Sequence, residues 1–141
     1  MPTRTATARW EGTLKEGTGR LDLGSGAFSG AYSFNSRFEE GTGTNPEEMI
    51  AAAEAGCYTM ALNNALHQAG FAPTSVETSA KVQMGRVDEQ LSITRIDLVT
   101  RGDVPGIDAD EFAKHAEAAR AGCIISRALS AVEITLDASL V

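Results

Sequence analysis

The sequence predicts an α+β fold. Short segments with strand character come first, a long helix follows, and two more strands precede a second helical stretch and a last strand. Strands and helices are therefore grouped along the chain, whereas a doubly wound parallel sheet would alternate them strictly. The length of 141 residues fits one domain, so a single domain over residues 1–141 is expected.

Three short strands are predicted near the start of the chain. Glycines separate runs that are rich in strand-forming residues, which is typical of an antiparallel meander with glycine turns. The three runs are residues 5–10, 19–23 and 31–35. Residues 37–44 are polar and contain glycine, which predicts an irregular connection.

A long helix is predicted over residues 46–69. Asn45 is a good N-cap, Pro46 suits the first helical position, and the two glutamates that follow lie at the positive end of the helix dipole. Gly70 stands where a helix commonly ends. About 24 residues give a helix of about 36 Å. Its first half, residues 49–61, is apolar on almost every face, which predicts a helix buried on most sides.

The second half of the chain predicts two strands, two helical segments and a final strand. Residues 76–84 and 91–101 alternate between apolar and polar types and are expected to pair antiparallel through residues 85–90. Asp108 and Glu111 form a capping pair for a helix over residues 109–121, which Gly122 ends. Residues 123–129 begin a second helical segment, and residues 131–138 form the last alternating strand.

Composition and charge exclude several classes of function. Twelve basic residues against nineteen acidic ones give a net charge of −7, which argues against nucleic acid or an anionic membrane as partner. No run of apolar residues is long enough for a membrane-spanning helix. The first residues lack the apolar core of a signal peptide, so a cytoplasmic protein is expected.

The two cysteines, Cys57 and Cys123, carry the chemical question. They allow one bridge, two inert buried thiols or one redox pair, and composition alone favours inert thiols. His67 and His115 are too far along the chain from the cysteines for a zinc motif, and no Cys-x-x-Cys is present. The spacing therefore argues against a zinc site and a thioredoxin-like motif, and the absence of any cofactor is what the family resemblance described below implies.

A peroxide-reducing thiol makes three chemical demands. The attacking species is the thiolate, so a cation must lower the thiol pKa. The leaving alkoxide needs stabilisation, and a second thiol must trap the sulfenic acid before it is oxidised further. Cys123 is a candidate for that trap, although the sequence alone does not show that the two cysteines meet.

Several blocks of the chain resemble the OsmC/Ohr family, which comprises osmotically inducible protein C and the organic hydroperoxide resistance proteins. The Asn-Ser-Arg-Phe block ahead of the long helix is similar to the OsmC branch in particular. Matching blocks occur in the family's order at residues 10–12, 34–39, 43–62, 69–71, 104–109, 121–123 and 133–137.

The resemblance implies both a fold and a reaction. Family members form intertwined homodimers of α+β subunits, with antiparallel sheets around long central helices. They reduce organic hydroperoxides, and less efficiently hydrogen peroxide, to alcohols and water without metal, haem or flavin. The reductant that it implies is a dithiol, with a lipoylated protein as a candidate, and the setting is the response to oxidative and osmotic stress.

Four residues match the family's catalytic positions. Cys57 matches the peroxidatic cysteine and Cys123 the resolving cysteine, so the resemblance implies a disulfide between them. Arg37 matches the arginine that stabilises the thiolate, and Glu47 matches the glutamate that pairs with it. Arg20 is a rival cation, because the Ohr branch takes its arginine from an earlier position.

Helix geometry adds one expectation about these four residues. Ten helical residues separate Glu47 from Cys57, or about 15 Å along the axis. We therefore expect Glu47 and Arg37 to reach the cysteines through loop folding or from the partner subunit.

Three residues depart from the family pattern. Glu54 stands where relatives often carry histidine, three residues before Cys57, and an anion close to that thiol would raise its pKa and oppose Arg37. Ile124 replaces a proline after Cys123, and Arg127 replaces a lysine or glutamine.

The leading hypothesis is a thiol-dependent organic hydroperoxide reductase. Two alternatives stay open: a non-catalytic relative that binds a small apolar ligand at the dimer interface, and a redox-sensing disulfide protein.

Overall fold

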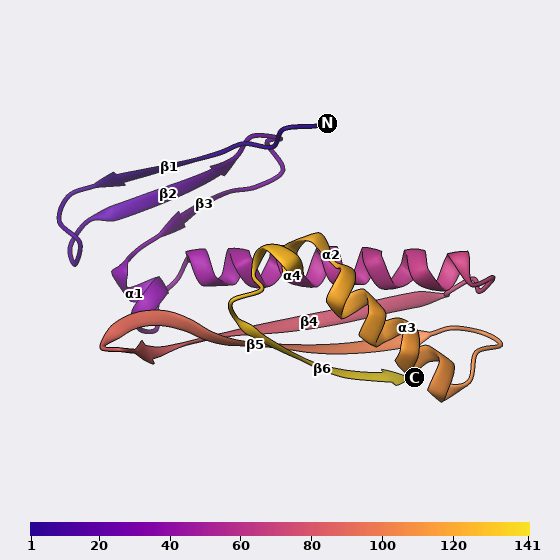
Figure 1. The fold of residues 1–141 in the computed structure, drawn as a ribbon. Coiled ribbons are helices and arrows are strands. Elements are labelled where there is room, and N and C mark those ends of the chain that lie inside the picture. The colour runs from indigo at the N-terminus through magenta and orange to yellow at the C-terminus, as the bar shows by residue number, and fades with distance from the viewer. The chain divides into compact units, whose positions relative to one another are not determined.

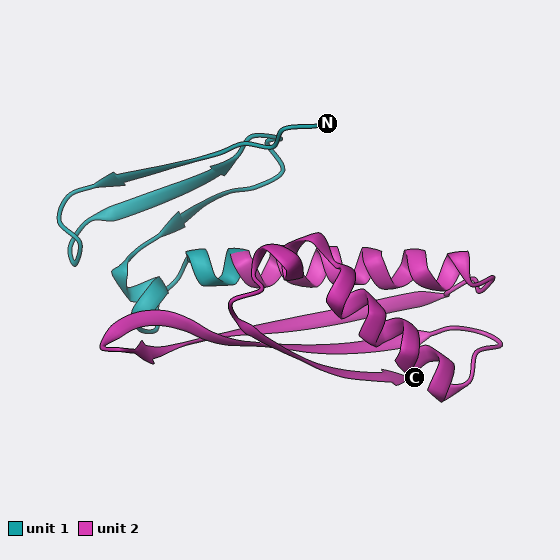
Figure 2. Ribbon diagram, viewed as in Figure 1, with its two compact units in different colours: residues 1–49 teal, residues 50–141 magenta.

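The helices and strands follow the grouped order that the sequence predicts, and the α+β class is confirmed. The computed structural model describes residues 1–141 and divides into two compact units, residues 1–49 and 50–141 (Figure 2). The expectation of one domain over residues 1–141 stays a prediction.

Figure 1 labels the elements of both units. The first unit holds β1 (Ala6–Glu11), β2 (Thr18–Leu23), β3 (Ser29–Tyr32), α1 (Phe34–Phe38) and the first turn of α2 (Pro46–Gln68). The second holds the rest of α2, β4 (Ser75–Val87), β5 (Gln90–Asp103), α3 (Ala109–Gly122), α4 (Ile124–Ala128) and β6 (Glu133–Leu140).

The first unit contains the predicted meander and one helix that was not predicted. β1, β2 and β3 pair antiparallel in that order. The predicted third strand and polar connection are wrong in their bounds, because β3 ends at Tyr32 and α1 follows. Ser33 and Ser36 explain the helix, since each hydroxyl accepts the other's backbone N–H, at 3.1 and 2.8 Å, in a reciprocal capping box.

The long helix α2 begins and ends where the local signals place it. The Asn45 side chain accepts the backbone N–H of Glu48 at 2.8 Å, as expected of an N-cap. Gly70 has φ +93°, and the N–H of Phe71 bonds back to the carbonyl of Leu66 at 3.0 Å. Only glycine adopts that backbone conformation readily, so Gly70 ends the helix.

The sheet of the second unit is mixed. β4 and β5 pair antiparallel through a two-residue turn in which Asp88 and Glu89 have φ +49° and +65°. β6 pairs with β5 in parallel, so the expectation of purely antiparallel sheets is wrong for this strand. The reason is topological: α3 and α4 form a crossover that returns the chain in the same direction.

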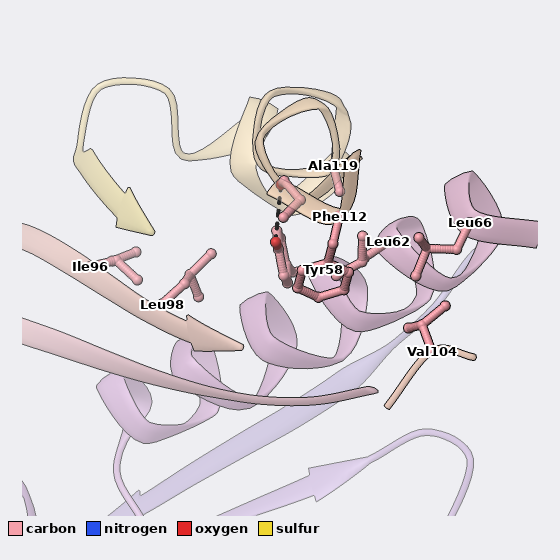
Figure 3. Packing of buried hydrophobic residues seen from close by; sticks show 9 residues of the cluster. Tyr58, Leu62, Leu66, Ile96, Leu98, Val104, Phe112 and Ala119 are labelled. Atoms are coloured by element: carbon pink, nitrogen blue, oxygen red, sulfur yellow. Dashed lines mark hydrogen bonds between the residues drawn. The ribbon is translucent and has the colours of Figure 1, made fainter. Parts of the chain in front are cut away.

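The core of the second unit lies between α2, α3 and β5 (Figure 3). β5 alternates, so that Ile96, Leu98 and Thr100 share one buried face. Gly102 continues that face, and a Cβ there would lie 2.6 Å from the Phe112 ring, so α3 packs this closely only over glycine. The buried apolar residues are Tyr58, Leu62, Leu66, Ile96, Leu98, Val104, Phe112, Ala116 and Ala119.

One strip of α2 is exposed. Ala52, Ala53, Gly56 and Met60 recur at helical spacing, and Met60 has an exposed fraction of 75%. The prediction that residues 49–61 are buried on most sides is therefore wrong for this strip, which is exposed in the single chain. None of the helices combines the length and the apolar character needed to cross a membrane.

Candidate active site

The two cysteines lie against each other, although 66 positions separate them in the sequence. Cys57 is on α2, and Cys123 is the single extended residue between α3 and α4. The Sγ atom of Cys123 donates to the Sγ atom of Cys57 at 2.7 Å, and both thiols are free. Cys57 is half-buried, whereas Cys123 is 1% exposed. Cys57 is therefore the more accessible residue of the pair, and Cys123 is the buried one.

Local structure fixes Cys123 in this place. Its N–H caps α3 by donating to the carbonyl of Ala119 at 3.0 Å, and its own carbonyl accepts the N–H of Arg127 at 2.9 Å. The hydroxyl of Tyr58 donates to the carbonyl of Ala116 at 3.0 Å (Figure 3). Tyr58 follows Cys57 directly, so this bond ties α2 to α3 next to the sulfur pair.

The surroundings shift the pKa of Cys123, which belongs to the pair, and of Tyr58, which follows Cys57 in the chain. Burial, and next the hydrogen bond to Cys57, raise the pKa of the Cys123 thiol, while the N–H groups of Ser126 and Ile125 and the Ser126 hydroxyl act in the opposite direction. Burial also raises the pKa of Tyr58, and the charge of Glu117 adds to the effect. Cys123 therefore holds its proton more firmly than an ordinary thiol.

A buried acid and a hydroxyl flank the cysteines. Glu54 lies one helical turn before Cys57 and has no exposed surface, and Ser126 lies one turn after Cys123. The Ser126 hydroxyl donates to the Oε1 atom of Glu54, and the Oε2 atom is buried without a partner. The sequence analysis noted Glu54 as a departure from the family pattern, but it did not identify Ser126 as a neighbour of the cysteines. The Cys-x-x-Ser spacing of residues 123–126 could have predicted it, because three residues along a helix place the hydroxyl one turn from the thiol.

Arg37 and Glu47 form the predicted ion pair within the first unit. The Nε atom of Arg37 lies 3.1 and 3.2 Å from the two carboxylate oxygens, and its Nη2 atom lies 2.7 Å from Oε1. The guanidinium also lies over the Phe38 ring, 5.0 Å from its centroid. Because the planar guanidinium is held by both carboxylate oxygens, its N–H groups point in fixed directions, whereas the ammonium of a lysine could rotate.

The polar contacts around α1 explain why these two side chains meet. The Ser36 hydroxyl donates to the carbonyl of Thr44 at 2.8 Å, and the Asn45 side chain donates to the carbonyl of Ser36 at 3.0 Å. These bonds hold α1 against the start of α2, and Arg37 follows Ser36 directly. The unpredicted helix α1 is thus the element that positions Arg37.

The rival cation Arg20 has other partners. Its side chain is paired with Asp22 at 3.4 Å, donates to Ser29, and is 60% exposed. The four predicted site residues come together as two pairs: Arg37 with Glu47 in the first unit, and Cys57 with Cys123 in the second. No group of three or more His, Cys, Asp or Glu side chains is arranged to hold a metal ion.

Comparison with known proteins identifies the family. The family model described as OsmC-like protein matches residues 39–137, which include all of the predicted site except Arg37. This chain belongs to the OsmC family. The peroxiredoxin OsmC of Escherichia coli K12 is 48% identical over 134 residues, covering 94% of this chain and 93% of that protein.

Solved structures support the OsmC fold. An organic hydroperoxide resistance protein from Elizabethkingia anophelis matches with a TM-score of 0.80 and 22% identity, covering all of this chain and 98% of the other. The organic hydroperoxide resistance protein OhrB of Bacillus subtilis matches with a TM-score of 0.76 and 23% identity, covering 96% and 98%. At these identities the likeness shows the fold alone.

Proposed function

We propose that this OsmC-family protein is a thiol-dependent peroxidase that reduces organic hydroperoxides, and less efficiently hydrogen peroxide, to alcohols and water. The Cys57 thiolate attacks the terminal oxygen of the hydroperoxide, and the O–O bond breaks. The alkoxide leaves and takes up a proton to become the alcohol, while Cys57 becomes a sulfenic acid. Cys123 then attacks the Cys57 sulfur, water leaves, and a disulfide forms. A dithiol reduces the disulfide and restores both thiols.

The observation that carries the proposal is the contact between the two sulfur atoms. They lie 2.7 Å apart, one on a half-buried and one on a buried residue, and come from segments 66 positions apart. An inert core thiol needs no second thiol against it. An accessible thiol backed by a buried one suits oxidation followed by rapid trapping. Such a cycling pair also suits a reducing compartment, as expected of a cytoplasmic protein.

The Arg37–Glu47 pair supplies the cation in this proposal. Glu47 holds the guanidinium in one orientation through both of its oxygens, so the remaining N–H groups can face a thiolate or a peroxide oxygen. We propose that the pair serves the Cys57 site, either within one chain or from the partner subunit.

A homodimer is part of the same proposal. The exposed strip of Ala52, Ala53, Gly56 and Met60 is apolar and made mostly of small residues, which let another backbone approach closely. A second copy of the chain would remove this strip from water. The proposed reductant is a small or protein-bound dithiol, with a lipoylated protein as a candidate.

The test is a peroxidase assay that follows both peroxide and disulfide. Cumene or tert-butyl hydroperoxide is supplied with dithiothreitol or dihydrolipoamide, and wild type is compared with Cys57→Ser and Cys123→Ser. We expect Cys57→Ser to lose peroxide consumption. We expect Cys123→Ser to lose disulfide-linked turnover while its Cys57 still reacts once with peroxide.

The two serine variants control for each other, because they make the same change at either sulfur. Unchanged peroxide consumption in Cys57→Ser would contradict the proposal. A single oxidation of wild type without turnover under any dithiol would favour a redox sensor. No oxidation at all would favour a ligand-binding relative.

A further inference from the structure

A closed circuit of contacts joins the two cysteines, and one of its members is the Tyr58 hydroxyl (Figure 3). Tyr58 follows Cys57 on α2, and its hydroxyl donates to the Ala116 carbonyl on α3 at 3.0 Å. Cys123 ends α3, where its N–H donates to the Ala119 carbonyl at 3.0 Å and its thiol donates to Cys57 at 2.7 Å. The circuit therefore leaves α2 at Tyr58, passes along α3 and returns to α2 at Cys57.

Helix geometry makes α3 a stiff link in this circuit. Seven residues are close to two turns of an α-helix, so Ala116 and Cys123 lie on the same side of α3, about 10 Å apart along the axis. Both are buried, with exposed fractions of 0% and 1%. A displacement of α3 at Ala116 is therefore carried to Cys123.

The bond from Tyr58 is the only side-chain hydrogen bond between α2 and α3. The other residues that these two helices contribute to their shared core are apolar. Apolar packing is not directional, whereas a hydrogen bond weakens steeply when its length or angle changes. Because Tyr58 is 0% exposed, water does not replace its partner. The hydroxyl is therefore the contact that limits how far α3 can slide along α2.

This bond matters most after Cys57 has reacted. In the reduced protein the hydrogen bond between the thiols also holds the sulfur atoms together. Oxidation of Cys57 changes one member of that bond, so it no longer restrains Cys123 in the same way. The bond between Tyr58 and Ala116 involves neither sulfur atom and is kept. It is thus available to hold the two segments in place during the step that forms the disulfide.

We propose that Tyr58 is a positioning residue for disulfide formation, and that its bond to the Ala116 carbonyl holds Cys123 within reach of the oxidised Cys57. This inference rests on the proposed Cys57–Cys123 cycle and deepens it.

The chemical step itself involves only the two cysteines. An electron pair of the Cys123 sulfur forms the S–S bond, the S–O bond of the Cys57 sulfenic acid breaks, and hydroxide leaves with the thiol proton as water. One sulfenic acid and one thiol give one disulfide and one water, so the Cys123 sulfur is oxidised and the Cys57 sulfur is reduced. Tyr58 keeps its proton throughout and contributes only the placement of α3.

The test must separate the Cys123 step from the Cys57 step. The reagent 5,5′-dithiobis(2-nitrobenzoate) does so without peroxide. The Cys57 thiolate attacks it, releases one coloured thionitrobenzoate and keeps the other half as a mixed disulfide. Cys123 then attacks the Cys57 sulfur and releases the second thionitrobenzoate. Stopped-flow absorbance records the two releases as separate phases.

The variant is Tyr58→Phe, which keeps the ring in the core and removes only the hydroxyl. We expect its first release to stay within about twofold of wild type, because the reagent reaches Cys57 without the help of α3. We expect its second release to slow by about tenfold. A misplacement of about 1 Å can cost about 10²-fold in rate, and the retained ring limits the displacement.

Thr100→Val is the matched control, because it also removes a buried hydroxyl and nearly keeps the shape of the side chain. Thr100 is 0% exposed on β5, shares a hydrogen bond with the Thr78 hydroxyl at 2.9 Å and donates to the Glu77 carbonyl at 3.2 Å. It lies outside the circuit, so both releases should match wild type although urea unfolding shows a comparable loss of stability. An unchanged second release in Tyr58→Phe would overturn the proposal. Equal slowing of both its releases, or the same slowing in Thr100→Val, would also overturn it.

A second readout uses excess cumene hydroperoxide. A sulfenic acid that waits longer for Cys123 is oxidised to sulfinic acid by a second hydroperoxide, which becomes the alcohol. Mass spectrometry should therefore find about tenfold more sulfinic acid, relative to disulfide, in Tyr58→Phe than in wild type or Thr100→Val. An unchanged ratio would contradict the positioning role. If peroxide fails to oxidise wild-type Cys57 while the second thionitrobenzoate release still depends on Tyr58, the peroxidase proposal fails and the positioning of Cys123 stands.

Discussion

The Arg37–Glu47 pair allows a sharp test of how the protein activates its thiol. The guanidinium makes three contacts with the carboxylate, at 2.7, 3.1 and 3.2 Å. The lysine of Arg37→Lys keeps the charge but offers one nitrogen, so it can hold about one of the three contacts. The substitution therefore removes the directional hydrogen bonds of the guanidinium and leaves the net charge unchanged.

The expected size follows from exposure. Hydrogen bonds to charged groups contribute about 1.5–3 kcal/mol each when well shielded. Because the Arg37 side chain is 37% exposed and Glu47 is 11% exposed, water replaces part of the loss. We expect a coupling free energy between the two side chains of about 1–2 kcal/mol in a double-mutant cycle of Arg37→Lys and Glu47→Gln, measured by urea unfolding.

The effect on reactivity should be larger than the effect on stability. If the fork faces the thiolate and the peroxide, its loss should slow the oxidation of Cys57 by about 10–10²-fold, because a misdirected donor no longer stabilises the developing charge. The assay is the single-turnover oxidation of Cys57 by cumene hydroperoxide. Arg20→Lys is the matched control, since it makes the same change at an exposed arginine. Equal rates in the two lysine variants would refute the role of Arg37.

Three further outcomes can be checked with purified protein. Tyr58→Phe should be about 1 kcal/mol less stable at neutral pH, because the hydroxyl no longer donates to Ala116. Burial raises the pKa of Tyr58, so above the ordinary value of 10.0 the folded protein keeps the phenol proton while the unfolded chain loses it. The free energy of unfolding of wild type should therefore fall with rising pH, by up to about 1.4 kcal/mol per pH unit. Tyr58→Phe should lack this fall when urea unfolding is measured at alkaline pH. Leu62→Ala should lower the free energy of unfolding, measured in urea, by about 2–5 kcal/mol, because Leu62 is 0% exposed in the core. The matched control Leu14→Ala changes a residue with an exposed fraction of 64% and should stay within about 0.5 kcal/mol of wild type. Met60→Lys should shift the protein toward monomer in analytical ultracentrifugation, and an unchanged dimer would show that the strip on α2 is not its interface.

Local signals predicted the helices well. The N-cap residues Asn45 and Asp108 each accept the backbone N–H three residues on, at 2.8 Å, and α2 and α3 begin one residue later. Capping depends on neighbours within one helical turn, so a single sequence contains it. The helix α1 was missed because its reciprocal cap uses two serines in place of the common Ser and Glu pattern.

Long-range pairing was predicted less well. The direction of β6 follows from the crossover through α3 and α4, and strand alternation looks the same in parallel and antiparallel pairs. The exposed strip on α2 looked like core because its composition is apolar, and apolar composition does not distinguish a core from a surface that another chain covers.

The sequence by itself determined the order of the strands and helices other than α1, the starts of α2 and α3, and the family, and it predicted four site residues. These depend on neighbours within a few positions or on blocks of residues read directly from the chain. Only the tertiary structure decided that Cys123 lies against Cys57, and that Glu54 is buried against Ser126. The physical reason is that α2 and α3 share one core with strand β5, and this shared core brings the junction between α3 and α4 to Cys57 on α2. The distance between two sulfur atoms 66 positions apart is therefore a property of that packing and not of either local segment.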